Sequence, residues 1–224
     1  VAGGVEGCFG NSGQSCDAPT RMFVPRKWHK DALEVARAKA ESMVTGDPRD
    51  PATNLGPVIS GAQFNKIQGL IQKGIDEGAT LVTGGTGRPK GLNRGWYVQP
   101  TVFGNVDHGM TISREEIFGP VLSIIPFDEE EEAVQIANDT PYGLASGVWS
   151  QNIDRCMRMM RAIRSGVVWV NTYRQAAPQV PFGGMKNSGY GRVRGHAGIL
   201  EWLQTKTVFI DYSGDRRDPF SMKF

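Results

Sequence analysis

Short β-rich runs alternate with segments of helical periodicity along most of this chain, and this alternation is the strongest constraint on its fold. Strands are predicted at 21–25, 79–85, 95–106, 121–127, 145–150, 166–171 and 205–212. Helices are predicted at 27–43, 63–77, 128–138 and 153–163, with a further helix around residues 1–9. Strands that alternate with helices in this way predict an α/β fold with a mostly parallel sheet flanked by helices.

Two glycine-rich stretches have the composition of phosphate-binding loops without the necessary context. Residues 84–91 follow a predicted strand, but Pro89 argues against a helix directly after them, and residues 189–195 follow no convincing strand. A dinucleotide-binding turn requires a strand, a glycine loop and a helix in succession. Both stretches are therefore predicted to be ordinary loops, as is the Pro-, Gly- and Asp-rich stretch 45–60.

The acidic run 128–132 has two possible explanations, a metal or basic partner on one side and a helix start on the other. Carboxylates are favoured in the first turn of a helix by the helix dipole, and Asp is a common N-cap residue. The sequence favours the helix start, with Asp128 as the N-cap.

The charge balance and the cysteine content exclude several classes of protein. With 25 basic and 23 acidic residues, the chain gives no reason to expect nucleic acid or an anionic membrane as a partner. No apolar run approaches the roughly 18 residues of a membrane span, and no signal peptide is visible. The few and scattered cysteines argue against disulfides and against a zinc site, and a reducing, cytoplasmic setting is the simplest expectation. The cysteines are Cys8, Cys16 and Cys156, and the histidines, isolated in the sequence, are His29, His108 and His196.

Cys16 is the candidate nucleophile. Free cysteine is often just a small buried apolar residue, which is the alternative here. The polar, flexible stretch "NSGQS" directly before Cys16 instead favours a turn that exposes the thiol and the backbone N–H to a cleft.

Five ordered motifs resemble those of the aldehyde dehydrogenase superfamily. The first, "FGNSGQSCDAPTRMFVP" at 9–25, resembles the nucleophile motif of that family. The others are "EEIFGPVLSI" at 115–124, "NDTPYGLASGVWS" at 138–150, "GVVWVN" at 166–171 and "PFGGMKNSGYGR" at 181–192, followed by "KTVFI". The similarity covers Val1 to about Tyr212. One departure is Val193, which stands where relatives often have Glu.

The resemblance implies a chemistry for the first two motifs. Cys16 would attack an aldehyde carbonyl, a hydride would pass to NAD or NADP, and water would release a carboxylic acid from the thioester. The Cys16 backbone N–H would hold the developing oxyanion. Glu116 would accept hydrogen bonds from the ribose hydroxyls on the nicotinamide side, and Phe118 would pack beside the nicotinamide ribose or ring. Gln63 and Lys66 occupy positions that approach the same ribose in relatives.

The resemblance also implies a substrate tunnel. Ser15 and Asp17 flank the nucleophile and are expected to line this tunnel. Residues 172–180 match the variable substrate loop of the family. Many relatives have an aromatic residue where this chain has Ala176, so a wider tunnel is expected.

Two residues of this loop carry a hypothesis about specificity. Arg174 or Gln175 would select a polar or carboxylate-bearing aldehyde, such as a semialdehyde. The alternative is that Arg174 points to solvent.

The resemblance further implies that the chain is the C-terminal, cysteine-bearing half of a longer enzyme. Full members are roughly twice as long, and their other half carries the cofactor domain, the general base and an Asn of the oxyanion hole. The chain does not begin with Met, and the only acid before Cys16 is Glu6, which is too close to the nucleophile to be that base. We therefore expect the chain alone to lack a complete dehydrogenase cycle.

The expected organisation is a catalytic domain at 1–204, an oligomerisation strand at 205–212 and a tail at 213–224. The strand would join copies of the full-length protein into a dimer or tetramer, although a core strand within one subunit is an alternative. Two other functions stay open: a CoA-acylating semialdehyde dehydrogenase, and a non-catalytic assembly domain that retained the fold. A Cys–His hydrolase is disfavoured because no His lies in a recognisable partner motif.

Overall fold

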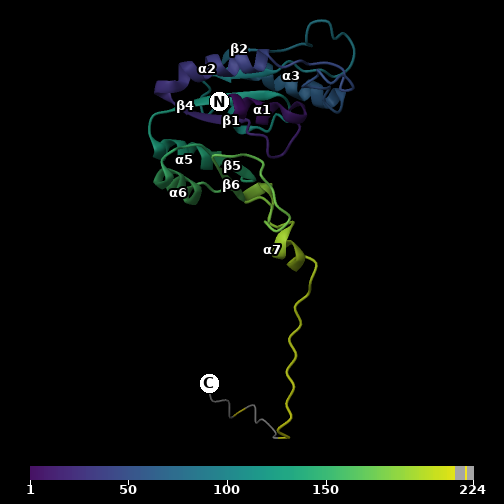
Figure 1. The fold of residues 1–224 in the computed structure, drawn as a ribbon, viewed down its shortest axis with the longest axis vertical. Coiled ribbons are helices and arrows are strands. Elements are labelled where there is room, and N and C mark those ends of the chain that lie inside the picture. Colours follow the sequence, from purple (N-terminus) through teal and green to yellow (C-terminus); the bar gives the residue numbers. More distant parts are fainter. Residues whose placement is uncertain (215–219, 221–224) are drawn as a thin grey trace.

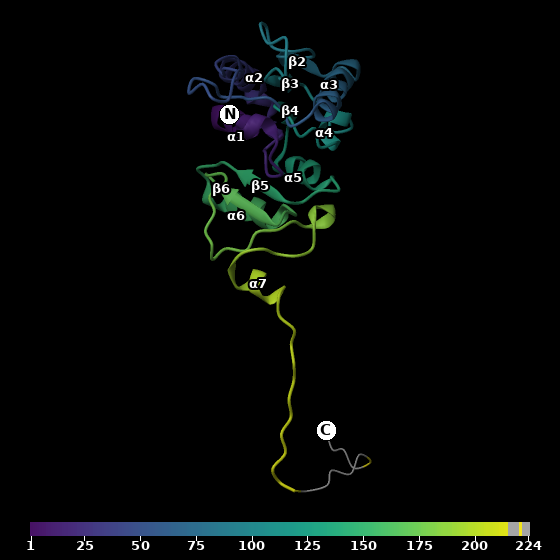
Figure 2. The same ribbon diagram turned by 90° about the vertical axis from the view of Figure 1, so that its right-hand side faces the viewer.

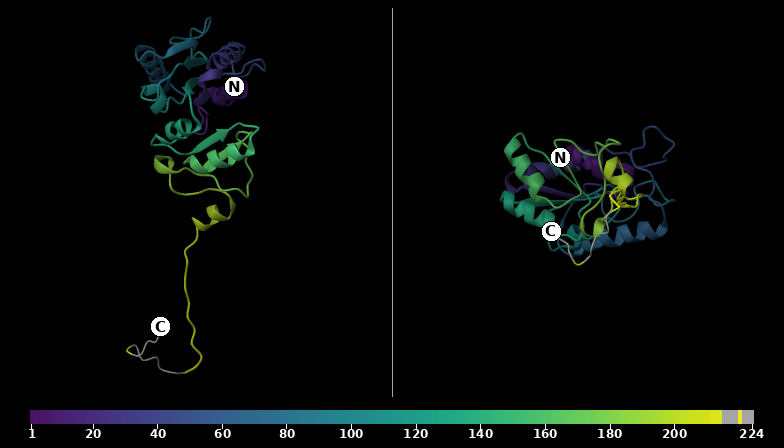
Figure 3. Two further views of the ribbon diagram at one scale, coloured as in Figure 1. Left: turned by 90° about the vertical axis from the view of Figure 1, so that its left-hand side faces the viewer. Right: turned by 90° about the horizontal axis from the view of Figure 1, so that it is seen from below.

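The computed structural model describes residues 1–214 and Phe220, and these form two groups of strands and helices followed by an extended segment (Figure 1). Figure 2 and the left view of Figure 3 show the second group directly below the first, with the short helix α7 (Gly195–Leu200) below the second group. Residues 203–214 lead away from α7 and are exposed to solvent.

The first group is built on a four-stranded sheet. Its strands are β1 (Arg21–Pro25), β2 (Thr80–Thr83), β3 (Thr101–Gly104) and β4 (Val121–Phe127), in the order β1-β4-β3-β2. β1 and β3 both run parallel to β4, and β2 pairs antiparallel with β3 at the edge. The prediction of a mostly parallel sheet flanked by helices is therefore confirmed.

Helices cover both faces of this sheet. Helices α1 (Ala2–Phe9) and α2 (Arg26–Glu41) pack on one face, and α3 (Gly61–Asp76) and α4 (Thr111–Arg114) pack on the other. Strand β4 serves both cores because successive side chains of a strand point to opposite faces. Leu122 and Ile124 are buried with α1 and α2, whereas Val121 and Ile125 are buried with α3 and α4.

The second group contains a separate two-stranded parallel sheet. Its elements are β5 (Ala145–Val148), β6 (Val167–Val170), α5 (Glu130–Asn138) and α6 (Ile153–Ala162). Glu130 joins the two helices, because its carboxylate accepts hydrogen bonds from Arg155 and Arg158 of α6.

The acidic run behaves partly as predicted. Glu130, Glu131 and Glu132 lie in the first turn of α5, which confirms the helix start. The prediction of Asp128 as the N-cap is wrong, because Glu129 takes that position without a side-chain cap. Asp128 instead forms a bidentate ion pair with Arg26, with contacts of 2.7 Å to Nε and 2.9 Å to Nη2.

The C-terminal strand predicted at 205–212 is not present in the described part of the chain. These residues are exposed and pair with no other described strand. Residues 215–219 and 221–224 of the expected tail lie outside the described residues. Among the described helices, none is both long and apolar enough to cross a membrane.

Candidate active site

Cys16 lies at the tip of a tight turn that follows α1. The chain leaves α1 through Asn11, Ser12 and Gly13, whose φ angles are 54°, 53° and 73°. A hydrogen bond of 3.0 Å from the Ala18 N–H to the Ser15 carbonyl then closes the turn around Cys16. The Cys16 side chain is exposed, and its N–H donates to no other described residue.

The other two cysteines have a different environment. Cys8 in α1 and Cys156 in α6 are buried, and all three cysteines are free thiols. Burial raises the pKa of the Cys8 thiol well above its ordinary value, so that thiol stays protonated. Cys16 is therefore the accessible thiol among these three.

The turn is supported by the loop 45–60 from one side. The Ser12 hydroxyl donates a hydrogen bond of 2.8 Å to the Gly56 carbonyl. The Gln14 side-chain oxygen accepts one of 2.9 Å from the Ile59 N–H. The predicted surface loop thus also supports the turn that carries Cys16.

The turn also touches the second motif. Gly13 lies so close to Gly119 that an added Cβ would come within 2.0 Å of the Gly119 carbonyl oxygen. Beside this contact, Phe118 adopts a left-handed conformation with φ 56°. The Gln63 side chain stabilises that conformation, because its Nε2 donates to the carbonyls of Ile117 and Phe118 at 3.0 and 2.9 Å.

Cys16 and residues of the second motif, 115–124, line one cleft of about 1040 Å³. Five residues that the sequence singled out are among its lining, namely Ser15, Cys16, Asp17, Glu116 and Phe118. Glu116 is exposed and Phe118 is half-buried. Gln63 and Lys66 do not line this cleft. The Gln63 side chain instead binds main-chain carbonyls of the second motif, and Lys66 is exposed on α3.

The predicted substrate loop lines a neighbouring pocket of about 270 Å³. Arg174, Gln175 and Ala176 lie in this pocket, not in the Cys16 cleft. Asp17 lines both spaces and stands between them. The two sets of expected substrate residues therefore meet at Asp17.

Asp17 and Arg174 form an ion pair that the sequence did not predict. Asp17 Oδ1 lies 3.0 Å from Nε and 2.8 Å from Nη2 of Arg174. The Tyr173 hydroxyl donates a hydrogen bond of 2.8 Å to the Asp17 carbonyl. The only signal in the sequence was the opposite charge of Asp17, in the first motif, and Arg174, in the loop 172–180.

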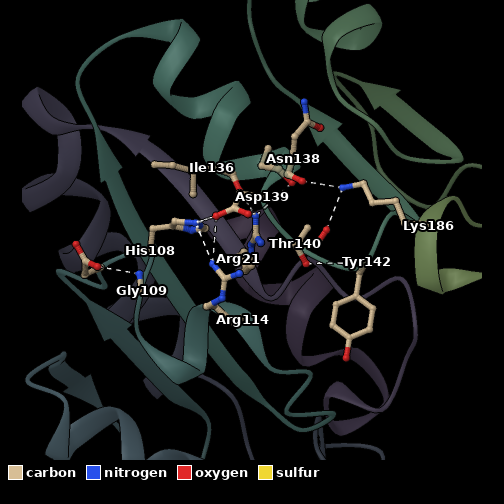
Figure 4. Close-up of polar contacts among 12 residues, drawn as sticks. Arg21, His108, Gly109, Arg114, Ile136, Asn138, Asp139, Thr140, Tyr142 and Lys186 are labelled. Atoms are coloured by element: carbon tan, nitrogen blue, oxygen red, sulfur yellow. Dashed lines mark hydrogen bonds and ion pairs between the residues drawn. The ribbon is translucent and has the colours of Figure 1, made fainter.

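A second polar network joins the two groups of the fold near the end of α5 (Figure 4). His108 contacts Asp139, and Arg114 Nη1 lies 3.1 Å from His108 Nε2 and 3.2 Å from Asp139 Oδ2. The description of His108 as isolated holds only along the sequence, because the fold brings it to Asp139 across 31 positions. Hydrogen bonds from His108 and Arg114 lower the pKa of Asp139.

Two cations satisfy the last carbonyls of α5 in the same network. Arg21 Nη2 donates to the Ile136 carbonyl at 2.9 Å, and Lys186 Nζ donates to the Asn138 carbonyl at 2.8 Å. Cations are favoured at this end of a helix by the helix dipole. Burial, with the charge of Arg114 nearby, lowers the pKa of Arg21 to about 10. Arg21, which also lines the cleft, therefore anchors β1 to α5.

The described residues contain no group of three or more His, Cys, Asp or Glu side chains that could hold a metal ion. The carboxylates of Asp128 and Glu130 in the acidic run contact arginines.

Comparison with known proteins points to one family. The model of the aldehyde dehydrogenase family matches residues 1–208. Betaine aldehyde dehydrogenases of Agrobacterium fabrum and Rhizobium etli are 45% and 43% identical over 211 residues, which is 94% of this chain and 43% of each relative.

Solved structures give the same result. A mutant of aldehyde dehydrogenase C from Pseudomonas syringae, in complex with NAD+ and octanal, superimposes with a TM-score of 0.89 and 48% identity, covering 92% of this chain and 42% of that one. An aldehyde dehydrogenase of Mycobacterium tuberculosis complexed with NAD+ gives a TM-score of 0.90 and 44% identity, covering 95% and 44%.

The chain spans less than half the length of these relatives. Sequence and structure nevertheless agree over nearly all of the described residues, including both motifs that meet at the cleft. The chain therefore belongs to the aldehyde dehydrogenase family.

Proposed function

We propose that this chain is the cysteine-bearing, C-terminal catalytic part of a longer NAD(P)-dependent aldehyde dehydrogenase, which oxidises an aldehyde to a carboxylic acid. One observation carries the proposal. Cys16 and Glu116 lie 100 positions apart in two motifs, and both line the same cleft. The reaction requires a nucleophile that attacks the aldehyde and a group that binds the cofactor beside it. Cys16 would be the nucleophile, and the exposed carboxylate of Glu116 would accept hydrogen bonds from the cofactor ribose.

Cys16 supplies the covalent chemistry in this proposal. Its thiolate attacks the aldehyde carbonyl carbon, a C–S bond forms, and the carbonyl oxygen becomes an oxyanion. The Cys16 N–H, which no other described residue uses, donates a hydrogen bond to that oxygen. After oxidation the acyl group is held on sulfur as a thioester, and attack by water releases the acid and restores the thiol.

The cofactor side of the cleft suits a nicotinamide nucleotide. NAD or NADP, when bound, supplies the hydride acceptor for this oxidation. Glu116 would accept hydrogen bonds from two ribose hydroxyls with its two oxygens, and Phe118 would pack beside the ribose or the nicotinamide ring. Gln63 would act through the motif, because its amide binds the carbonyls of Ile117 and Phe118. Both solved relatives described above were determined with NAD+, which supports NAD.

The substrate is proposed to be a small aldehyde that enters beside Asp17. Ser15 and Asp17 would line its path at the nucleophile, and Gln175 and Ala176 would line the adjoining pocket. The curated relatives include betaine aldehyde dehydrogenases, and one solved relative was determined with octanal. Selection of a polar or carboxylate-bearing aldehyde by Arg174 or Gln175 stays a prediction.

The proposal also covers assembly and location. Residues 1–204 would form the catalytic domain of a cytoplasmic protein, and 205–212 would pair with a neighbouring subunit in a dimer or tetramer. The exposed apolar side chains of this segment support such pairing: Val208, Phe209, Ile210 and Tyr212 are 64%, 94%, 67% and 90% exposed.

The experiment measures the reaction of Cys16 with aldehyde separately from turnover of the complete catalytic cycle. The purified chain is mixed with an aldehyde and NAD+ or NADP+, and both the reduced cofactor and the protection of Cys16 from iodoacetamide are measured. We expect protection without turnover, and Cys16→Ser abolishes the labelling that reports it. The protein expressed from the complete reading frame should oxidise the aldehyde and lose this activity with the same substitution.

Each alternative gives a different result. Turnover by the chain alone would refute the fragment proposal. Acyl-CoA formed by the complete protein on addition of CoA would favour the acylating class. No reaction of Cys16 with any aldehyde would favour the assembly domain.

A further inference from the structure

The ion pair between Asp17 and Arg174 joins the turn that carries Cys16 to the loop 172–180. Asp17 directly follows Cys16, and its side chain is 21% exposed, whereas that of Arg174 is 30% exposed. The guanidinium also lies near Gly10, where an added Cβ would be 3.4 Å from Nη1. Arg174 thus lies near the start of the turn and contacts it beside Cys16.

The backbone of Arg174 is held in place by its neighbours. Arg174 has φ 56°, a left-handed conformation that a non-glycine residue keeps only where its surroundings fix it. The Trp169 Nε1 donates a hydrogen bond of 2.9 Å to the Gln175 carbonyl. The centroid of the Tyr173 ring lies 4.6 Å from that of the Trp169 ring, and the Tyr173 hydroxyl donates a hydrogen bond to the Asp17 carbonyl.

We propose that Arg174 is a positioning residue, whose ion pair with Asp17 fixes the turn that presents Cys16, and that its charge is not available to bind a substrate carboxylate. This inference rests on the proposed function, because the position of the turn matters only if Cys16 is the nucleophile. It differs from the hypothesis that Arg174 selects acidic aldehydes, since the carboxylate that Arg174 binds belongs to this chain.

The physical reason is the partial burial of the pair. Partly buried charges attract each other more strongly than fully exposed charges. Removal of either charge leaves the charge of its partner uncompensated. The Asp17 carboxylate and the Arg174 guanidinium also hold adjoining loops whose remaining contacts are hydrogen bonds and ring packing. Loss of the pair should therefore shift the turn without unfolding either loop.

The reactivity of Cys16 provides the test, because it needs neither cofactor nor turnover. The native chain is alkylated with iodoacetamide, which is neutral, and with iodoacetate, which carries a carboxylate and the same leaving group. Mass spectrometry of peptides assigns the label to Cys16, and circular dichroism verifies that each variant is folded. The variants are Arg174→Gln, Arg174→Lys, Asp17→Asn and the double Asp17→Asn/Arg174→Gln. Arg194→Gln is the matched control, since Arg194 lines the same pocket without contacting Asp17.

The proposal predicts coupled effects. Arg174→Gln and Asp17→Asn each change the iodoacetamide rate by at least about twofold, the double variant changes it no more than either single one, and Arg174→Lys restores part of it. Asp17→Asn also raises the iodoacetate-to-iodoacetamide ratio, because it frees the guanidinium. Arg194→Gln leaves the iodoacetamide rate unchanged.

Two results would overturn the proposal. One is additive effects of the single substitutions, which would show that the two residues act independently. The other is an unchanged iodoacetamide rate in Arg174→Gln together with a lower iodoacetate ratio, which would mark Arg174 as a free anion-binding group. Neither result depends on aldehyde chemistry, so failure of the proposed function remains distinguishable.

Discussion

Gly13, in the turn that leads to Cys16, and Gly119 lie main chain against main chain, so that a Cβ on Gly13 would lie 2.0 Å from the Gly119 carbonyl oxygen. Gly13 also has φ 73°, a conformation that side chains disfavour. This contact holds the motif of Cys16 against the motif of Glu116, and it restricts position 13 to glycine.

Replacement of Gly13 should therefore be costly. Gly13→Ala is expected to lower the free energy of unfolding by roughly 2–4 kcal/mol, through overpacking and a left-handed alanine. Chemical denaturation measures the change. Gly69→Ala is the matched control, because Gly69 lies within α3 with no atom within 4 Å of its added Cβ. The control should gain roughly 0.5–1 kcal/mol, and an equal loss in both variants would contradict the assignment.

Gln63 should matter more than its neighbour Lys66 on α3. Gln63→Ala leaves the carbonyls of Ile117 and Phe118 without their donor and should cost about 1–3 kcal/mol of unfolding free energy. In the complete protein it should also raise the KM for the cofactor, because the left-handed Phe118 loses its support. Lys66 is exposed, so Lys66→Ala should change the free energy of unfolding by no more than about 0.5 kcal/mol and should leave the KM for the cofactor unchanged. Equal effects of the two variants would argue against a supporting role for Gln63.

The network at the end of α5 should make stability depend on acid. Hydrogen bonds from His108 and Arg114 hold the pKa of Asp139 below its ordinary value of 3.8. A group whose folded-state pKa is depressed contributes stability above its unfolded-state value, and this is lost as the pH falls through the folded-state value. The melting temperature should therefore fall less on acidification in Asp139→Asn than in the wild type, below about pH 4. Asp31 is an exposed residue of α2, so in Asp31→Asn the melting temperature should fall with pH as in the wild type. An equal fall of the melting temperature in both variants would refute the role of Asp139.

Thiol labelling should distinguish the three cysteines. Native protein treated with iodoacetamide should be modified at Cys16 and spared at Cys8 and Cys156, because the latter two side chains are 0% and 1% exposed. In denaturant all three should react. Rapid native labelling of Cys8 would show that α1 leaves the core, since the raised pKa of this thiol reflects its burial.

Much of the fold follows from local patterns. The run 121–127 was predicted as a buried strand and is β4, and the predicted helix 63–77 corresponds to α3, because apolar spacing in these segments records which face is buried. Of the predicted β-rich stretch 95–106, only Thr101–Gly104 form a strand, β3. Residues before Thr101 are held by side-chain packing, as where Trp96 lies 5.9 Å from Phe64.

The site depended on contacts that no local pattern contains. The motifs identified Cys16 and Glu116 as candidates, and the fold places both at one cleft. The pairing of Asp17 with Arg174 spans 157 positions, and that of His108 with Asp139 spans 31. Such pairs arise from the packing of whole elements, which spacing along the chain does not encode. Helix α7 was missed because its six residues include two glycines and show little periodicity.

The support of the nucleophile turn by the loop 45–60 has a practical consequence for directed evolution. Ser12 binds the carbonyl of Gly56 and Gln14 binds the N–H of Ile59, so both contacts use the main chain of the loop. The Ile59 side chain itself is 82% exposed. A library that randomises Ile59 therefore varies the protein surface while it retains the main-chain contacts that support the turn of Cys16.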